Sequence, residues 1–177
     1  MTEPLRLAEY GTLRTTISQR GSVRFCLILA GLIAWGVLTL ALNAAEFERA
    51  VTLVPLIVLA ATFEVSFFIH TGVERVGRYL QVFHEDVDGW ENTIMNYGRN
   101  NSGGLDPLFI TLFALVAVVN FFGAFPAAAR HVGWLVISIL AHLVFGWRLL
   151  TARRLARGQR ALDFDRFLAL KNTPVSK

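Results

Sequence analysis

Residues 25–42 read FCLILAGLIAWGVLTLAL and contain no charged side chain. A helix needs roughly 20 mostly apolar residues to cross the hydrocarbon core of a bilayer. Three further stretches have the same apolar character, namely residues 51–70, 107–129 and 132–150. A helix of a water-soluble bundle needs a polar face, and none of the four stretches has one. The sequence therefore predicts an all-α, polytopic membrane protein built on a bundle of four transmembrane helices.

The composition of the whole chain agrees with this class. Charged residues make up 17% of the chain and hydrophobic residues 54%, whereas soluble domains carry about 25% charged residues. The charges are also segregated, because Glu64 and Arg148 are the only ones inside the four stretches. A soluble domain is therefore not expected.

The distribution of basic residues predicts the orientation of the spans. Fifteen of the 17 Lys and Arg residues lie in segments 1–24, 71–106 and 148–177. Alternating spans place these three segments on one side, and the excess of positive charge marks that side as cytoplasmic. We therefore expect a multi-pass protein of the cell membrane with its N- and C-termini in the cytoplasm.

The segments outside the spans are expected to form cytoplasmic extensions of the bundle. Residues 1–24 are predicted to be an amphipathic N-terminal helix, and residues 151–177 a basic C-terminal helix or tail. Residues 98–106 are rich in Gly and Asn, which is typical of a flexible loop. The N-terminal helix would enter the first span directly.

The mid-chain segment 71–97 carries a heptad pattern of apolar residues. Its members follow a 3-4-3-4-3-4-3 spacing: Val73, Val76, Leu80, Phe83, Val87, Trp90, Ile94 and Tyr97. Such a pattern predicts an amphipathic helix that continues the second span as a stem. Gly89 leaves open whether the stem is one helix or two, because glycine weakens a helix by about 1 kcal/mol relative to alanine. This interaction seam has to be buried against a terminal helix, a second copy or another protein.

Three polar residues inside the spans are candidates for a buried cluster: Glu64, Asn120 and His142. Ionisable residues within spans are costly and usually face the interior of the bundle or a water cavity. One interpretation is a proton relay or cation site. The other is structural, because polar side chains also hold neighbouring membrane helices together by hydrogen bonds. The spacing alone leaves both interpretations open.

The arginines at the cytoplasmic end of the fourth span are candidates for contact with anionic lipid headgroups: Arg148, Arg153, Arg154, Arg157 and Arg160. Each basic residue near an anionic membrane surface adds about 1 kcal/mol of attraction. Membrane topology accounts for these arginines by itself. Nucleic acid is therefore not an expected partner.

No residue set in the sequence predicts a cofactor, a metal or a catalytic centre. A haem held by His70 and His142 is disfavoured, because our depth estimate separates them by roughly 12 Å along the bilayer normal. His84, Asp88 and Glu91 share a helix face, but an exposed acidic face predicts the same residues. No serine stands in a nucleophile-elbow motif. An enzyme is therefore the less expected class.

Three functions follow from these patterns. The first is a non-enzymatic membrane module that self-associates or binds another membrane protein through the 71–97 seam. The alternative is an oligomeric ion channel or proton-coupled transporter that uses Glu64 with Asn120 and His142. A membrane-embedded enzyme is the third. The expected partners are the bilayer, anionic headgroups, and a second copy or another membrane protein.

Overall fold

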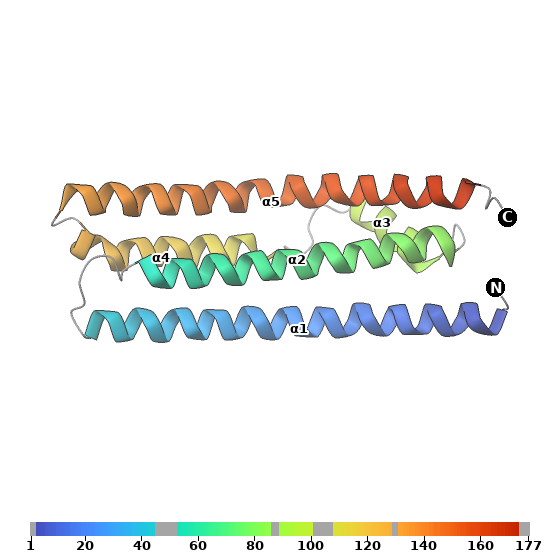
Figure 1. Ribbon diagram of the computed structural model, residues 1–177, viewed down its shortest axis with the longest axis horizontal. Helices are drawn as coiled ribbons and strands as arrows, with labels where there is room; N and C mark the ends of the chain where they lie inside the picture. The colour runs from blue at the N-terminus through green and yellow to red at the C-terminus, as the bar shows by residue number, and fades with distance from the viewer. Residues whose placement is uncertain (1–2, 45–52, 86–88, 101–107, 129–130, 174–177) are drawn as a thin grey trace. The chain divides into compact units, whose positions relative to one another are not determined.

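The computed structural model describes residues 3–44, 53–85, 89–100, 108–128 and 131–173. Within these ranges every regular element is a helix (Figure 1), which confirms the predicted all-α class. The helices are α1 (Glu3–Ala44), α2 (Val54–Phe83), α3 (Trp90–Asn100), α4 (Ile110–Ala128) and α5 (Val132–Asn172).

Three of these helices, α1, α2 and α5, are long and apolar enough to cross a membrane. Their length and composition support a membrane helical bundle, as the sequence predicted. The apolar stretch described in α4 is shorter and covers Ile110–Gly123. Helix α4 begins three residues later than predicted, because Phe109 has a φ of 52°, and this left-handed conformation does not fit an α-helix.

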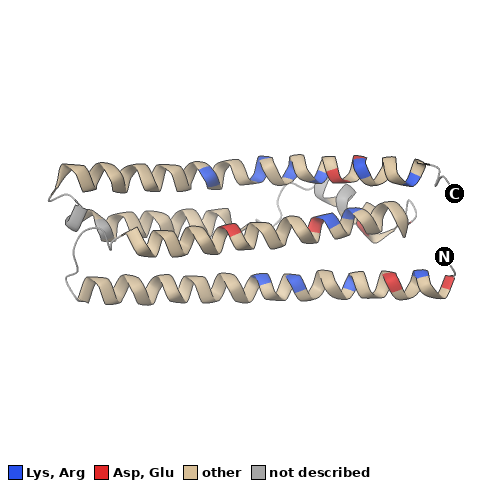
Figure 2. Cartoon of the chain, viewed as in Figure 1, with Lys and Arg blue, Asp and Glu red and all other residues tan. Residues whose placement is uncertain are grey.

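The contacts within the chain divide it into two compact units. The first, which we call the charged unit, comprises residues 1–24, 68–105 and 154–177. The second, the apolar unit, comprises residues 25–67 and 106–153. Helices α1, α2 and α5 contribute residues to both units. Figure 2 shows the charged residues of α1 gathered toward its N-terminal end.

Phenylalanines form the core of the apolar unit. Phe63 of α2 is almost fully buried. Its ring packs edge-on against Phe113 of α4, with centroids 5.2 Å apart, and against Phe145 of α5, at 6.2 Å. Helix α1 approaches α2 closely at Gly31, where a Cβ atom would collide with the side chain of Thr62. Small residues allow this close approach between membrane helices.

The segment 71–97, for which the sequence left open one helix or two, forms two helices. Helix α2 ends at Phe83 and α3 begins at Trp90. The backbone N–H groups of His84 and Glu85 both bond to the carbonyl of Leu80, which closes the last turn of α2. Gly89 accepts the first hydrogen bond of α3 from Thr93. The break therefore includes Gly89, and the heptad pattern does not continue through it.

The other two extensions continue their spans without a break. Helix α1 covers both residues 3–24 and the apolar stretch 25–42, and α5 covers both the apolar stretch 132–150 and residues 151–172. Aromatic rings support this end of the charged unit, since Phe167 of α5 packs edge-on against Tyr79 and Phe83 of α2. These ring contacts hold the C-terminal segment against α2, and the segment is helical as far as Asn172.

Candidate functional site

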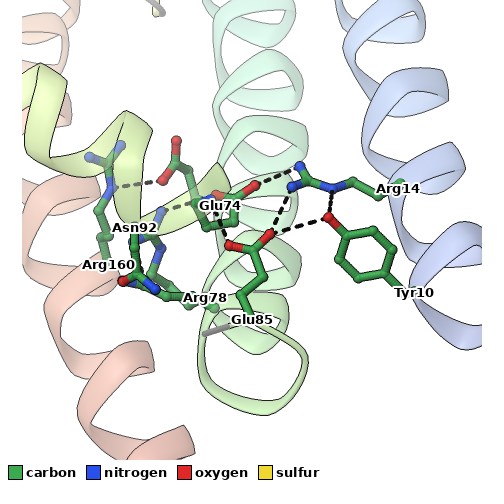
Figure 3. Close-up of polar contacts among 9 residues, drawn as sticks. Tyr10, Arg14, Glu74, Arg78, Glu85, Asn92 and Arg160 are labelled. Atoms are coloured by element: carbon green, nitrogen blue, oxygen red, sulfur yellow. Dashed lines mark hydrogen bonds and ion pairs between the residues drawn. The ribbon is translucent and has the colours of Figure 1, made fainter. Parts of the chain in front are cut away.

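Arg14 of α1 lies at the centre of a polar cluster in the charged unit (Figure 3). Its Nη2 atom is 2.9 Å from Oε1 of Glu85, and its Nη1 atom is 2.8 Å from Oε1 of Glu91. Its Nε donates to the hydroxyl of Tyr10 at 3.0 Å. Both carboxylates are largely buried. One guanidinium therefore compensates two buried negative charges and ties α1 to the α2–α3 connection.

Arg78 of α2 completes this cluster from the other side. It is only 4% exposed, and its Nη2 atom lies 3.5 Å from Oε2 of Glu91. Its Nη1 donates to Gln81, whose Nε2 donates to Oδ1 of Asn92 at 2.6 Å. Burial raises the pKa of Glu91 against the opposing effect of Arg14 and Arg78. Burial also lowers the pKa of Arg78.

A second set of ion pairs ties α5 to α2 within the charged unit. Nε of Arg160 is 2.7 Å from Oε2 of Glu74, and Nε of Arg75 is 3.1 Å from Oδ2 of Asp163. Nζ of Lys171 donates to the carbonyl of Val82 at 2.6 Å. All four helical segments of the unit are therefore joined by charged hydrogen bonds, which are about twice as strong as neutral ones.

These four segments line a cavity of about 1100 Å³ that is partly open to solvent. Ile17 of α1, Val73 of α2 and Phe164 of α5 form an apolar part of its wall. Charged residues of the polar cluster form another part. This cavity could not be predicted from the sequence, because it depends on how four separate segments pack.

The part of the seam that lies on α2 is internal to the charged unit. Leu80 is fully buried, and Val73, Val76 and Phe83 are half-buried. Phe83 packs edge-on against Phe167 of α5. The C-terminal helix therefore covers this part of the seam at Phe83.

The part of the seam that lies on α3 is exposed. Trp90 is 61% exposed, Ile94 42% and Tyr97 64%. The opposite face of α3 carries Glu91 and Asn92, which belong to the polar cluster. The remaining member of the seam, Val87, lies outside the described residues. We refer to Trp90, Ile94 and Tyr97 as the α3 apolar face.

The structure brings Asn120 and His142 together in the apolar unit, and adds Trp35. The indole Nε1 of Trp35 donates to Oδ1 of Asn120 at 3.0 Å, and Nδ2 of Asn120 lies 3.2 Å from Nε2 of His142. Nδ1 of His142 lies 2.8 Å from the carbonyl of Ser138. A carbonyl can only accept, so Nδ1 carries the proton and Nε2 accepts from Asn120. A neutral imidazole satisfies this whole chain of hydrogen bonds. The indole N–H, which needs an acceptor in an apolar span, was the sequence signal for Trp35.

Glu64 does not join this chain of hydrogen bonds, and the prediction that it is buried is wrong. Its side chain is 48% exposed, and its two oxygens lie 2.7 and 2.8 Å from Nε and Nη2 of Arg148. The guanidinium of Arg148 also lies over the ring of Phe67, 4.6 Å from its centroid. The two charged residues of the predicted spans therefore neutralise each other in a bidentate pair.

The remaining candidate lipid-contact arginines fall into two groups. Arg160 is bound to Glu74. Arg153, Arg154 and Arg157 are exposed. For Arg154 and Arg157, no ion-pair partner lies among the described residues. Contact between these arginines and lipid stays a prediction.

The histidines considered for haem and metal sites have other partners. Nη1 of Arg24 lies 2.6 Å from Nδ1 of His70, so this ring nitrogen accepts a hydrogen bond. Nε2 of His84 lies 3.5 Å from Oε2 of Glu9. In the part of the chain that the structure describes, no three His, Cys, Asp or Glu side chains are placed to hold a metal ion. Asp88 lies outside that part.

Comparison of the chain with protein-family models, with curated proteins and with solved structures finds no match.

Proposed function

We propose that this chain is a multi-pass protein of the cell membrane that self-associates through the α3 apolar face. The observation that carries the proposal is the division of α3 into two faces. Glu91 and Asn92 fix one face in the polar cluster, while the other presents Trp90 and Tyr97 to solvent, 61% and 64% exposed. The contacts of Glu91 and Asn92 therefore hold α3, and with it the exposed face, in place.

A second copy of the chain is the occupant that this surface fits best. Trp90, Ile94 and Tyr97 carry no charge, so the face can meet its own copy across a two-fold axis without like-charge repulsion. Trp and Tyr are also enriched at the centres of protein interfaces. Another membrane protein is the alternative occupant of the same face.

The proposal includes four membrane spans, with α4 as the third. Helix α4 has 19 residues, which at 1.5 Å per residue make about 28 Å, close to the roughly 30 Å of the hydrocarbon core. With four spans, the Arg-rich ends of α1 and α5 lie on the same side. The positive-inside rule favours the cytoplasm for that side.

Cysteine labelling tests this topology, because Cys26 is the only cysteine of the chain. In a Cys26→Ser background, His131→Cys and Gly158→Cys introduce single thiols before and after the predicted fourth span. In intact cells, a membrane-impermeant maleimide is expected to label the first variant and not the second. After cell lysis both should react. Labelling of both variants in intact cells would contradict the proposed orientation.

Self-association is tested by native mass spectrometry and mass photometry of the protein in lipid nanodiscs and mild detergent. We expect oligomers for the wild type and monomers for the double variant Trp90→Ser/Tyr97→Ser. The matched control is Leu162→Ser/Leu168→Ser, which changes two exposed apolar residues of α5 in the same unit, and it should still associate. A monomeric wild type, or a double variant that associates like the wild type, would rule the proposal out.

The channel or transporter alternative has less support. Glu64 is bound by Arg148, and the chain through Asn120 and His142 is satisfied with a neutral imidazole. A proton relay needs a group that changes charge, and each of these candidates already has a partner. Ion flux by the wild type in liposomes, together with loss of this flux in Glu64→Gln, would support the channel or transporter alternative. Among the residues that the structure describes, no set supports the membrane-enzyme alternative.

A further inference from the structure

The cavity of the charged unit is large enough for a small organic ligand. Its volume of about 1100 Å³ reaches the upper end of the usual range for ligand sites, which is about 300–1000 Å³. Segments of α1, α2, α3 and α5 all contribute to its wall. A cavity framed by four helices that are joined by ion pairs is preformed, so a ligand would not have to order the protein.

Two of the three carboxylates that line the cavity, Glu74 and Glu91, already have cationic partners. Glu74 is bound by Arg160 at 2.7 Å, and Glu91 by both Arg14 and Arg78. An incoming cation would compete with these guanidiniums for the same oxygens. The charge of the wall therefore does not favour a cationic ligand at these positions.

Arginine side chains of the wall retain capacity for an anion. Arg157 of α5 lines the cavity, and no ion-pair partner for it lies among the described residues. Arg160 follows three residues later, so the two side chains are neighbours on the helix. Arg160 contacts Glu74 through Nε, and its two Nη atoms carry four further N–H groups. Paired guanidiniums are the usual donors to phosphate in proteins.

Asp165 gives the cavity wall a hydrogen-bond acceptor. It lies on α5 eight residues after Arg157 and five after Arg160, which is about 12 and about 8 Å along the helix. At about 12 Å, Asp165 does not neutralise Arg157. Among the residues described, it has no ion-pair partner. Ile17, Val73 and Phe164 lie between the helices as an apolar wall, suited to the body of an organic molecule.

We infer that this cavity binds a small organic phosphate that carries hydroxyl or amino groups at the end opposite its phosphate. Arg157 and Arg160 hold the phosphate, and Asp165 accepts hydrogen bonds from the other end. The phosphate belongs either to a soluble molecule or to the headgroup of a phosphorylated lipid. The inference does not rest on the proposed self-association. Ile94 of the α3 apolar face lines the cavity, whereas Trp90 and Tyr97, the two residues changed in the association test, do not.

Binding to the full chain in nanodiscs tests the inference. In one arm the nanodiscs contain only phosphatidylcholine, and the probes are inorganic phosphate and adenosine monophosphate. In the other arm the nanodiscs also contain phosphatidylinositol 4-phosphate. Binding is measured by isothermal titration in the first arm and by co-purified lipid in the second. A soluble ligand predicts binding in the first arm, and a lipid headgroup predicts binding only in the second.

Two arginine variants distinguish the cavity from a general basic surface. Arg154 and Arg157 are both exposed residues of α5 without an ion-pair partner among the described residues, but only Arg157 lines the cavity. Arg157→Gln is expected to weaken binding at least about tenfold, and Arg154→Gln to change it less than about twofold. Both should keep the thermal unfolding midpoint of the wild type.

A third variant tests the acidic end of the cavity. Asp165→Asn is expected to weaken binding of adenosine monophosphate and to leave the affinity for inorganic phosphate unchanged or higher. The inference is overturned if no probe binds in either arm. It is also overturned if Arg157→Gln and Arg154→Gln lose binding equally, because the arginines would then act as unspecific surface charge.

Discussion

The side chain of Glu85 caps helix α3: its Oε2 atom accepts a hydrogen bond from the backbone N–H of Glu91 at 2.7 Å. A carboxylate at this place satisfies an N–H group that has no partner within the helix, and it interacts favourably with the helix dipole. The two residues are also two neighbouring buried negative charges. Arg14 bridges them from α1, so the position of α3 depends on a residue of the N-terminal helix.

Replacing Arg14 should therefore loosen α3 locally. Arg14→Gln leaves two largely buried carboxylates without their shared cation, which costs about 3 kcal/mol in comparable buried pairs. We expect amide hydrogens of α3 to exchange roughly 100-fold faster, measured by hydrogen-exchange mass spectrometry. Arg20→Gln on the exposed face of α1 is the control and should leave α3 unchanged. Equal protection of α3 in Arg14→Gln and the wild type would contradict the assigned role.

Glu91 should make the stability of the charged unit depend on pH. Burial raises its pKa above the usual 4.5, although Arg14 and Arg78 act in the other direction. The folded state then binds the proton more tightly than the unfolded state, so the contribution of Glu91 to stability falls as pH rises from 4.5 through the raised pKa.

The comparison with Glu91→Gln isolates this contribution. The free energy of unfolding of the wild type minus that of the variant should decrease with rising pH across this window. Urea unfolding in detergent between about pH 4 and pH 7 measures it. A difference that stays constant or increases with pH would mean that the guanidiniums, and not burial, dominate the pKa of Glu91.

The pair of Glu64 and Arg148 should matter for insertion into the membrane. A single charge within a span costs about 2.5–3.5 kcal/mol on insertion scales, and the bidentate pair reduces this cost for both residues. Arg148→Gln is expected to lower the yield of membrane-integrated protein. Glu64→Gln/Arg148→Gln should restore the yield, because no unpaired charge is left. A double variant that inserts no better than Arg148→Gln would show that the pair is not the cause.

The chain of hydrogen bonds through Asn120 should hold α1, α4 and α5 together in the apolar unit. Asn120→Ala removes the partner of the Trp35 indole and of the His142 ring. Each such contact between membrane helices contributes about 0.6 kcal/mol, so we expect a loss of about 1 kcal/mol in stability. The Nε1–H resonance of Trp35 should move upfield in an ¹⁵N-correlated NMR spectrum. An unchanged resonance would mean that the indole has another acceptor.

The helical class and the apolar stretches could be predicted from the sequence because they depend on local composition. Long runs with few or no charges predict helices that cross a membrane. Three of these runs lie in helices that are long and apolar enough to do so. The break in the stem was harder to predict. The heptad pattern runs through Gly89 without interruption. The hydrogen bond by which Glu85 caps α3 depends on the folded conformation of the connection between α2 and α3, so it could not be recognised in the sequence.

The pairings between helices could not be predicted, because they depend on rotation and depth. Glu64 and Arg148 are 84 positions apart, and only the packing of α2 against α5 brings them to the same level. The same holds for Arg14 and Glu91, which are 77 positions apart. Glu64 could be recognised from the sequence as an unusual charge within an apolar stretch. It was grouped with Asn120 and His142, whereas its partner in the structure is Arg148. The cavity could not be predicted either, because its wall comes from four segments.

The make-up of the charged unit sets an order on its biosynthesis. Its helices come from three segments, and the apolar segments 25–67 and 106–153 separate them. The partners that α5 supplies to Glu74 and Arg75 are Arg160 and Asp163, which are synthesised after both apolar segments. These ion pairs therefore form only once both apolar segments have been made.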